Sequence, residues 1–440
     1  MTQAQARTAS SATASSARRP TAGAARRSGS GQAHEGKGFL RRQWDRVEST
    51  DAAGIRTAYY LIIICTAVLT CIGMVMVLSS SAVEYVSKNK DPYSLFAKQA
   101  SFGVIGLIFM FVIAGMSQRF LKRLAWPALF VAGLLLIAVL IPGIGRNVLG
   151  NQNWIVVGPI SVQPSELAKV ALILWAATVL NAKQKLLSNW KHAVIPVVLP
   201  GGLAVLGLVV LEHDLGTVII LAMILLVLLW SSGAPRVIFA GVGAVGVVGV
   251  IGMAAMSGNR VGRISEWWKA LTGQPVDPQG VGMQALQGRY ALASGGFFGV
   301  GLGQSRSKWS YVPEAQNDFI LSIIGEELGL IGTIAIVVMF IVMALSMYRI
   351  AHRSRSVFVR VATSGVIAWL VGQAFVNMGM VTGLLPVIGV PLPFISYGGS
   401  SLLASLLGVG LVLSFARDQI KNGLPEHEQE LAPVSKGRKA

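Results

Sequence analysis

Four carboxylates crowd into one short stretch of an otherwise acid-poor chain. The segment Ser307–Gly329, SKWSYVPEAQNDFILSIIGEELG, contains Glu314, Asp318, Glu326 and Glu327, whereas the whole chain has only 19 acids in 440 residues. A carboxylate can accept a proton or pair with a cation. Asp318 opens an apolar run, and the Glu pair follows about two helical turns later, where burial in lipid is costly without a polar partner. The pattern predicts a water-accessible cavity at one end of this run.

Further charged residues stand at the ends of other apolar runs. Glu166 and Lys169 are three residues apart, which places them on one face of a helix. Their simplest interpretation is a mutual ion pair at a helix end, and the alternative is that both line the cavity. Asp214 lies between two runs, and Lys98 suits a snorkelling anchor at the membrane interface. Asp318 also has a plain alternative, because the Asn-Asp pair at this position could cap the helix that follows.

Such a cavity suits a ligand with an anionic head and a hydrocarbon tail. Cationic side chains would hold a phosphate, and a carboxylate would serve as a base. The chain lacks the P-loop pattern, and GVGLGQ lacks the βαβ context of a dinucleotide site. The two cysteines, Cys65 and Cys71, would point about 120° apart on a helix, so we expect no disulfide. Metal-ligand spacing is absent from the sequence.

The composition places these residues in a membrane protein. Hydrophobic residues make up 53% of the chain, charged residues only 13%, and the mean hydropathy is +0.62. Soluble domains carry about 25% charged residues. We therefore predict an all-α polytopic membrane protein with ten transmembrane helices. They are expected near residues 57–79, 99–116, 124–143, 166–181, 194–211, 215–231, 237–256, 319–347, 357–381 and 398–415.

Charge and composition also divide the chain. We predict a disordered basic tail over 1–55, the membrane domain over 56–418 and a second tail over 419–440. The net charge of +18 lies mostly in the first tail and in short loops, which favours an orienting role at the membrane over nucleic-acid binding. This positive-inside bias puts both termini in the cytoplasm. The longest outer segment, 257–318, falls between the seventh and eighth helices and is expected to hold short interfacial or re-entrant helices.

Four segments together resemble a known family. They are GNQNWIVVGPISVQPSELAK (150–169), EHDLGT (212–217), YALASGGFFGVGLGQSRSKWSYVPEAQNDFILSIIGEELG (290–329) and GLLPVIGVPLPFISYGGSSLL (383–403). Their order and spacing resemble the SEDS family, closest to its cell-division branch, over about residues 55–418. The resemblance implies a ten-helix enzyme that polymerises lipid II into glycan strands at the outer leaflet and releases undecaprenyl diphosphate.

The resemblance also implies roles for individual residues. The family's essential aspartate falls on Asp318, which would deprotonate the acceptor 4-hydroxyl as it attacks C1 of the donor sugar. The cations that match the leaving diphosphate are Lys98, Lys169, Arg260 and Lys308. The residues on other motif positions around the cavity are Trp154, Glu166, Asp214 and Glu314. No cofactor is implied with certainty, although a divalent cation, Mg²⁺ or Mn²⁺, on the diphosphate is compatible with this chemistry.

One position departs from the family pattern. Many relatives carry an arginine just before the motif tryptophan, where this chain has Asn153. A charge contact made there in relatives must be absent here or supplied by another residue, such as Arg146.

The resemblance implies partners as well as chemistry. They are lipid II, membrane lipid, a class B penicillin-binding protein transpeptidase and other division proteins, in the plasma membrane at the septum. Two other hypotheses compete with the enzyme. A lipid II flippase lacks support from a visible inverted repeat with paired broken helices. A scaffold that recruits a transpeptidase leaves the Glu326 and Glu327 pair unexplained.

Overall fold

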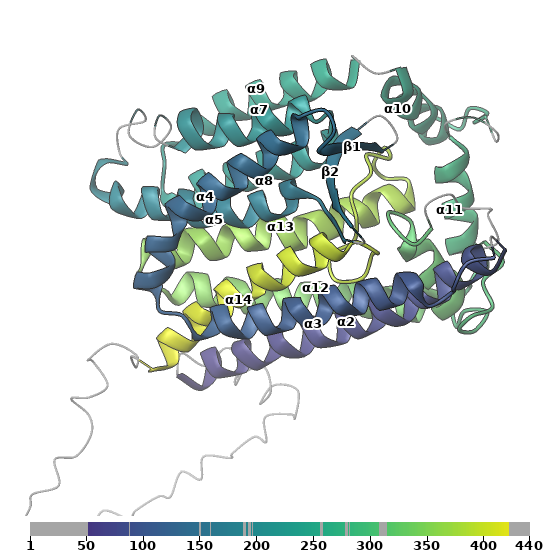
Figure 1. The fold of residues 1–440 in the computed structure, drawn as a ribbon, viewed down its shortest axis with the longest axis horizontal. Coiled ribbons are helices and arrows are strands. Elements are labelled where there is room, and N and C mark those ends of the chain that lie inside the picture. The colour runs from purple at the N-terminus through teal and green to yellow at the C-terminus, as the bar shows by residue number, and fades with distance from the viewer. Residues whose placement is uncertain are drawn as a thin grey trace, which may run out of the picture. The chain divides into compact units, whose positions relative to one another are not determined.

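Long apolar helices make up most of the computed structural model (Figure 1). It describes residues 52–87, 89–148, 151–158, 160–187, 191, 195, 197–255, 258–277, 280, 282–307 and 315–421. Most of the residues expected to form the two tails therefore lie outside the described part. The helices long and apolar enough to cross a membrane are α2 (Ala52–Ser87), α3 (Ser94–Gly115), α4 (Gln118–Leu140), α5 (Pro164–Ala182), α8 (Leu215–Ser232), α12 (Ile320–Arg353), α13 (Val357–Thr382) and α14 (Gly399–Lys421).

The polytopic membrane fold predicted from the sequence is confirmed, whereas the number of ten helices stays a prediction. Within the described residues, eight helices qualify as spans, and α9 (Arg236–Ala255) with α10 (Gly258–Leu271) would add a ninth. The latter two helices meet at 106°. A short helix, α7 (Leu203–Leu211), preceded by a π-helical turn, stands at the end of the expected fifth span. Most of residues 188–196, where that span would begin, lie outside the described part.

A small antiparallel sheet between α4 and α5 was not predicted from the sequence. Its strands pair in chain order: β1 (Gly145–Val148), β2 (Asn151–Val157) and β3 (Ile160–Val162). The β-branched and aromatic residues of β2 favour a strand, and Gly158, with φ of 59°, turns the chain into β3. Strands of three to seven residues give a weaker periodic signal than long apolar runs.

Helix α13 lies at the centre of the packing around the site. It contacts α5, α8 and α12, while α14 packs along α3 and α2. Helices α3 and α4 expose most of their apolar side chains, as expected for surfaces that face lipid. The central position of α13 buries two polar side chains, Gln373 and Asn377, each at most 1% exposed.

The segment 257–318 contains α10 and a second short helix, α11 (Met283–Ser294). The chain after α11 runs against a break in α12 at Gly329, whose backbone angles are φ 69° and ψ −166°. There the Val300 amide donates to the carbonyl of Glu326, and the Leu330 amide donates to the carbonyl of Gly296. This pairing satisfies backbone groups that the break frees, which is required of irregular backbone at membrane depth.

Candidate active site

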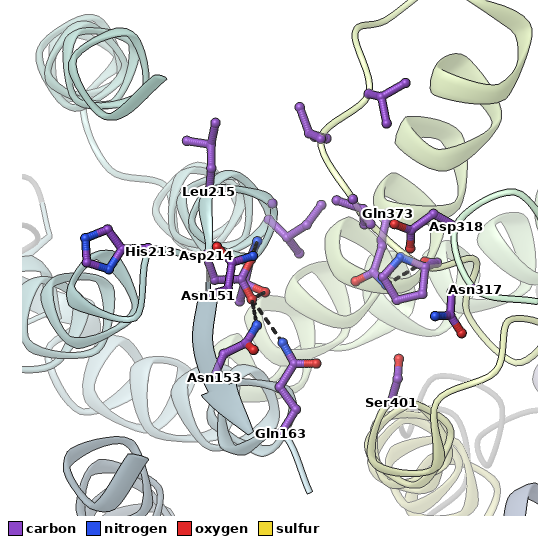
Figure 2. A pocket seen from close by; sticks show the side chains of 18 of the residues that line it. Asn151, Asn153, Gln163, His213, Asp214, Leu215, Asn317, Asp318, Gln373 and Ser401 are labelled. Atoms are coloured by element: carbon purple, nitrogen blue, oxygen red, sulfur yellow. Dashed lines mark hydrogen bonds between the residues drawn. The ribbon is translucent and has the colours of Figure 1, made fainter. Parts of the chain in front are cut away.

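A cavity of about 940 Å³ gathers segments that are far apart in the chain (Figure 2). Its walls come from β2, the start of α5, the junction of α7 and α8, α10, the turn before α12, the middle of α13 and the loop before α14. Six of the nine site residues predicted from the sequence line it: Trp154, Glu166, Lys169, Asp214, Arg260 and Asp318. Lys98 is exposed near the start of α3 and is not among the lining residues. Lys308 and Glu314 lie outside the described residues.

Asp318 is half-buried in the turn that leads into α12. Asn377 of α13 fixes this turn, because its Nδ2 donates to the Asp318 carbonyl at 2.8 Å and to the Val390 carbonyl at 2.7 Å. The chain passes close to the carboxylate at Gly389, where an added Cβ would lie 3.4 Å from Asp318 Oδ2. The boundary residue of α12 is Phe319, whose side chain makes no capping hydrogen bond. The helix-cap interpretation of Asp318 stays a prediction.

The loop before α14 also holds the turn that carries Asp318. The Ser396 hydroxyl donates to the Asn317 carbonyl at 2.6 Å. The Tyr397 amide donates to the Gln316 carbonyl at 2.9 Å. These hydrogen bonds fix the backbone of residues 316–318 and so restrict where the Asp318 carboxylate can lie.

Asp214 lies across the cavity from Asp318 (Figure 2). It caps α8 by accepting hydrogen bonds from the backbone amide and the hydroxyl of Thr217, both at 2.9 Å. Its Oδ2 also accepts from Asn153 Nδ2 at 2.9 Å and from Gln163 Nε2 at 3.0 Å. Asp214 thus joins the starts of α8 and α5 to strand β2.

Asn153 stands where many relatives were expected to carry an arginine, and its contact with Asp214 shows what it binds here. Asn153 gives a neutral hydrogen bond to a carboxylate. Arg146 is exposed on β1 and does not line the cavity. The hypothesis that Arg146 supplies a compensating charge is therefore not supported.

Glu166 and Lys169 form a buried ion pair in the first turns of α5. Lys169 Nζ lies 2.7 Å from Glu166 Oε1, and the two side chains are 1% and 3% exposed. The lysine also donates to Gln373 Oε1 at 3.1 Å and lies 5.1 Å from the centre of the Trp369 ring. The sequence left open whether these residues form a mutual ion pair or line the cavity. The structure shows both, because the two side chains pair with each other and both line the cavity.

Helix α10 contributes two arginines to the cavity wall. The Arg260 guanidinium donates to the carbonyls of His213 and Met253, the latter at 3.3 Å. Arg263 follows one turn later and was not identified from the sequence, although its spacing of three residues from Arg260 predicts a shared helical face. The site therefore combines a half-buried carboxylate with cations from two separate helices.

Comparison with known proteins places this geometry in a family. The model of the cell cycle protein family that comprises FtsW, RodA and SpoVE matches residues 59–421. The chain belongs to this family. It is 42% identical over 363 residues to the Mycobacterium tuberculosis (strain H37Rv) protein named probable peptidoglycan glycosyltransferase FtsW, which covers 82% of this chain and 68% of that protein. Stage V sporulation protein E of Bacillus subtilis is 37% identical over 359 residues, 81% of this chain and 96% of that protein.

Solved structures share this fold. A chain described under "Structural coordination of polymerization and crosslinking by a peptidoglycan synthase complex" is 28% identical, with a TM-score of 0.66 and coverage of 81% of this chain and 97% of that chain. The rod shape determining protein RodA of Thermus thermophilus is 28% identical, with a TM-score of 0.59 and coverage of 81% and 96%. The resemblance to the SEDS family noted in the sequence is confirmed.

The two glutamates of the segment GEELG (325–329) do not line this cavity, and the prediction that the cavity accounts for them is wrong. Glu326 accepts hydrogen bonds from the Ser305 hydroxyl at 2.5 Å and from the Arg306 amide at 2.9 Å. Glu327 accepts from the Ser79 hydroxyl of α2 at 2.9 Å. Neither glutamate lines the cavity. Their partners belong instead to the loop after α11 and to α2.

One buried acid of this FtsW/RodA/SpoVE protein was not singled out from its sequence. Glu212 lies between α7 and α8 and is fully buried. Neither carboxylate oxygen has a hydrogen-bond partner among the described residues. Burial, followed by the nearby charge of Asp214, raises the pKa of Glu212 to about 8. Glu212 is therefore mostly protonated at neutral pH.

Two polar residues of α13 that shape the cavity were also not predicted from the sequence. Gln373 and Asn377 bind four of the groups that shape the cavity, namely Lys169, Pro391, Asp318 and Val390. A signal was present, because two carboxamides four residues apart in an apolar run share one helical face.

Proposed function

We propose that this chain is a peptidoglycan glycosyltransferase that polymerises lipid II into glycan strands during septal wall synthesis. The observation that carries the proposal is the cavity between apolar helices, which half-buried Asp318 lines together with cationic side chains of α5 and α10. Relatives named peptidoglycan glycosyltransferase support the reaction class. The family match over 59–421 supports its transfer to this chain.

Asp318 acts as the general base in this proposal. Its carboxylate accepts the proton of the acceptor GlcNAc 4-hydroxyl while the oxygen attacks C1 of the donor MurNAc. The new C1–O bond forms as the bond from C1 to the diphosphate oxygen breaks, and the electron pair leaves with undecaprenyl diphosphate. The backbone contacts that hold residues 316–318 would keep the carboxylate in place through this step.

The predicted substrate contacts follow from the lining. Lys169 and Arg260 are the predicted cations that line the cavity, and Trp154, Glu166 and Asp214 complete its wall. Lys98, which is exposed on α3, would act only if substrate extends beyond the cavity. Lys308 and Glu314 keep their predicted roles as substrate contacts.

A divalent cation on the diphosphate stays a prediction. The described residues contain no group of three His, Cys, Asp or Glu side chains arranged to hold a metal ion. The Asp214 carboxylate already accepts four hydrogen bonds. The described side chains do not fit a metal held by protein groups alone, so no step is assigned to Mg²⁺ or Mn²⁺.

We further propose that the chain works with a class B penicillin-binding protein, beside other division proteins. The similarity to a chain from a peptidoglycan synthase complex supports such a partner. In this arrangement the protein spans the plasma membrane at the septum, with both termini in the cytoplasm and the cavity at the outer leaflet.

The proposal is tested by incubating the purified full-length chain with lipid II, with and without its transpeptidase partner. We expect glycan strands of many disaccharides, resolved on a gel after removal of peptide crosslinks. Transport of labelled lipid II across vesicles without strand formation would favour the flippase. Strands made only by the partner would favour the scaffold.

A further inference from the structure

The cations that line the cavity are not equally available to a ligand. Of the described lining residues, three carry a permanent positive charge, and these are Lys169, Arg260 and Arg263. Lys169 is only 1% exposed and is occupied by Glu166 and Gln373. Its charge is neutralised at 2.7 Å by the Glu166 carboxylate, so it adds little net attraction for an anion.

The two arginines of α10 differ from this lysine. Arg260 donates to two backbone carbonyls, which leaves its charge uncancelled. Arg263 has neither a hydrogen bond nor an ion pair within the described part of the chain. A guanidinium offers five donors in a planar fork that matches phosphate oxygens. An uncompensated charge at a membrane cavity is costly, so its retention there points to an anionic ligand.

The acid nearest in sequence does not neutralise Arg263. Glu266 stands three residues further along α10, but its Oε1 accepts from Lys269 Nζ at 2.7 Å. Its Oε2 accepts from the Asp277 amide at 3.0 Å. Both oxygens of the Glu266 carboxylate are therefore bound by groups at or beyond the C-terminal end of α10. Glu266 does not line the cavity.

The wall formed by α5 and β2 favours hydrogen-bond donors, whereas the arginines of α10 favour an anion. Glu166 Oε2 and Asn153 Oδ1 are buried acceptors without a partner among the described residues. Both residues line the cavity and are at most 6% exposed. Unpaired acceptors favour groups that donate, such as hydroxyls and amides, and disfavour phosphate oxygens.

We infer that Arg263, with Arg260 beside it, binds the diphosphate of the lipid-linked substrate, and that Lys169 does not contact this group directly. The inference rests on the proposed function for the identity of the anion. It assigns the charged end of the substrate to α10. The wall formed by α5 and β2 would contact the sugar of the substrate, whose hydroxyl and acetamido groups can donate hydrogen bonds to its acceptors.

The test measures binding of undecaprenyl diphosphate to the full-length protein in nanodiscs, alongside the uncharged alcohol undecaprenol. For Arg263→Gln we expect diphosphate affinity to fall by at least about tenfold, as for a desolvated charge contact, with undecaprenol binding unchanged. Arg263→Lys should recover part of the loss, because a point charge replaces the fork. Lys185→Gln, which removes an exposed cation that does not line the cavity, is the control and should bind as the unmodified chain does.

Turnover separates this inference from the proposed function. For Arg263→Gln we expect the KM for lipid II to rise at least about tenfold while kcat falls less. Equal diphosphate affinity in Arg263→Gln and the unmodified chain would overturn the inference, even if both proteins make strands. A third outcome is also informative: the unmodified chain makes no strands, yet it binds the diphosphate more tightly than Arg263→Gln does. The anion site would then be supported and the polymerase proposal would fail.

Discussion

Lys169 Nζ lies 2.7 Å from Glu166 Oε1, and neither side chain is more than 3% exposed. Spacing on the helix alone predicts a surface-type pair worth about 0–1 kcal/mol. Burial changes the expectation, because removing one partner of a buried pair leaves an uncompensated charge. The same two residues thus serve the stability of α5 and the shape of the cavity.

Lys169→Met is expected to lower the free energy of unfolding by ~3–5 kcal/mol, because the Glu166 carboxylate is left buried without its cation. The double variant Glu166→Gln/Lys169→Met removes both charges and should recover most of this loss. Thermal melting of the purified variants in one detergent provides the comparison. A Lys169→Met protein that melts like the unmodified chain would show that the pair contributes no stability.

Glu212→Gln is expected to stabilise the protein increasingly as the pH rises. The folded pKa of about 8 stands above the ordinary glutamate value of 4.5, so the stability present below about pH 4.5 is lost as the pH rises through 8. The amide cannot ionise and avoids this loss, which approaches about 5 kcal/mol at most. Melting temperatures of both proteins between pH 5 and 9 should diverge steadily and level off above pH 8. Parallel curves would contradict the burial of a neutral acid at this position.

Gly329→Ala is expected to destabilise the break in α12 by more than about 1 kcal/mol. Gly329 has φ of 69°, and an added Cβ would lie 2.4 Å from the Gly299 amide nitrogen and 2.5 Å from the Phe297 carbonyl oxygen. These are backbone atoms that cannot move aside cheaply. Gly133→Ala is the matched control, since nothing lies within 4 Å of its added Cβ, and it should melt at or slightly above the unmodified temperature.

A cysteine at Gln274 is expected to react with an impermeant thiol reagent added to intact cells whose wall has been made permeable. Gln274 is exposed between α10 and α11, in the segment predicted to lie outside. The control is Gln184→Cys, exposed just after α5 and predicted to be cytoplasmic, which should react only after lysis. Both are made in a chain that lacks Cys65 and Cys71. The reverse labelling pattern would overturn the orientation and the proposed side of the active site together.

The sequence predicts what depends on neighbouring residues. Apolar runs long enough to span a membrane are visible without any fold, and the spacing of Glu166 and Lys169 gives their pairing. The partner of Glu327 could not be predicted this way, because Ser79 lies 248 residues earlier in the chain. Arg263 was missed for a related reason. Arg263 has no partner among the described residues, and this property of the assembled cavity is not visible in any local sequence pattern.

The short sheet shows a different limit. Strand β2 places Asn153 against Asp214, and this contact depends on the turn at Gly158 and on the position of α8. The sequence indicates neither the turn nor the distance between strand and helix. The tertiary contacts of Asp214 with β2 and α5 were therefore outside what composition and periodicity could give.

The most direct test of the account is strand formation by purified Asp318→Asn beside the unmodified chain, each with its transpeptidase partner and lipid II. The amide keeps the shape of the side chain but cannot accept the proton at neutral pH. The amide also keeps the ability to cap a helix, so we expect an unchanged melting temperature. We also expect lipid II to bind as before and glycan strands to be absent. Long strands made by a folded Asp318→Asn protein would contradict the assignment of Asp318 as the catalytic base.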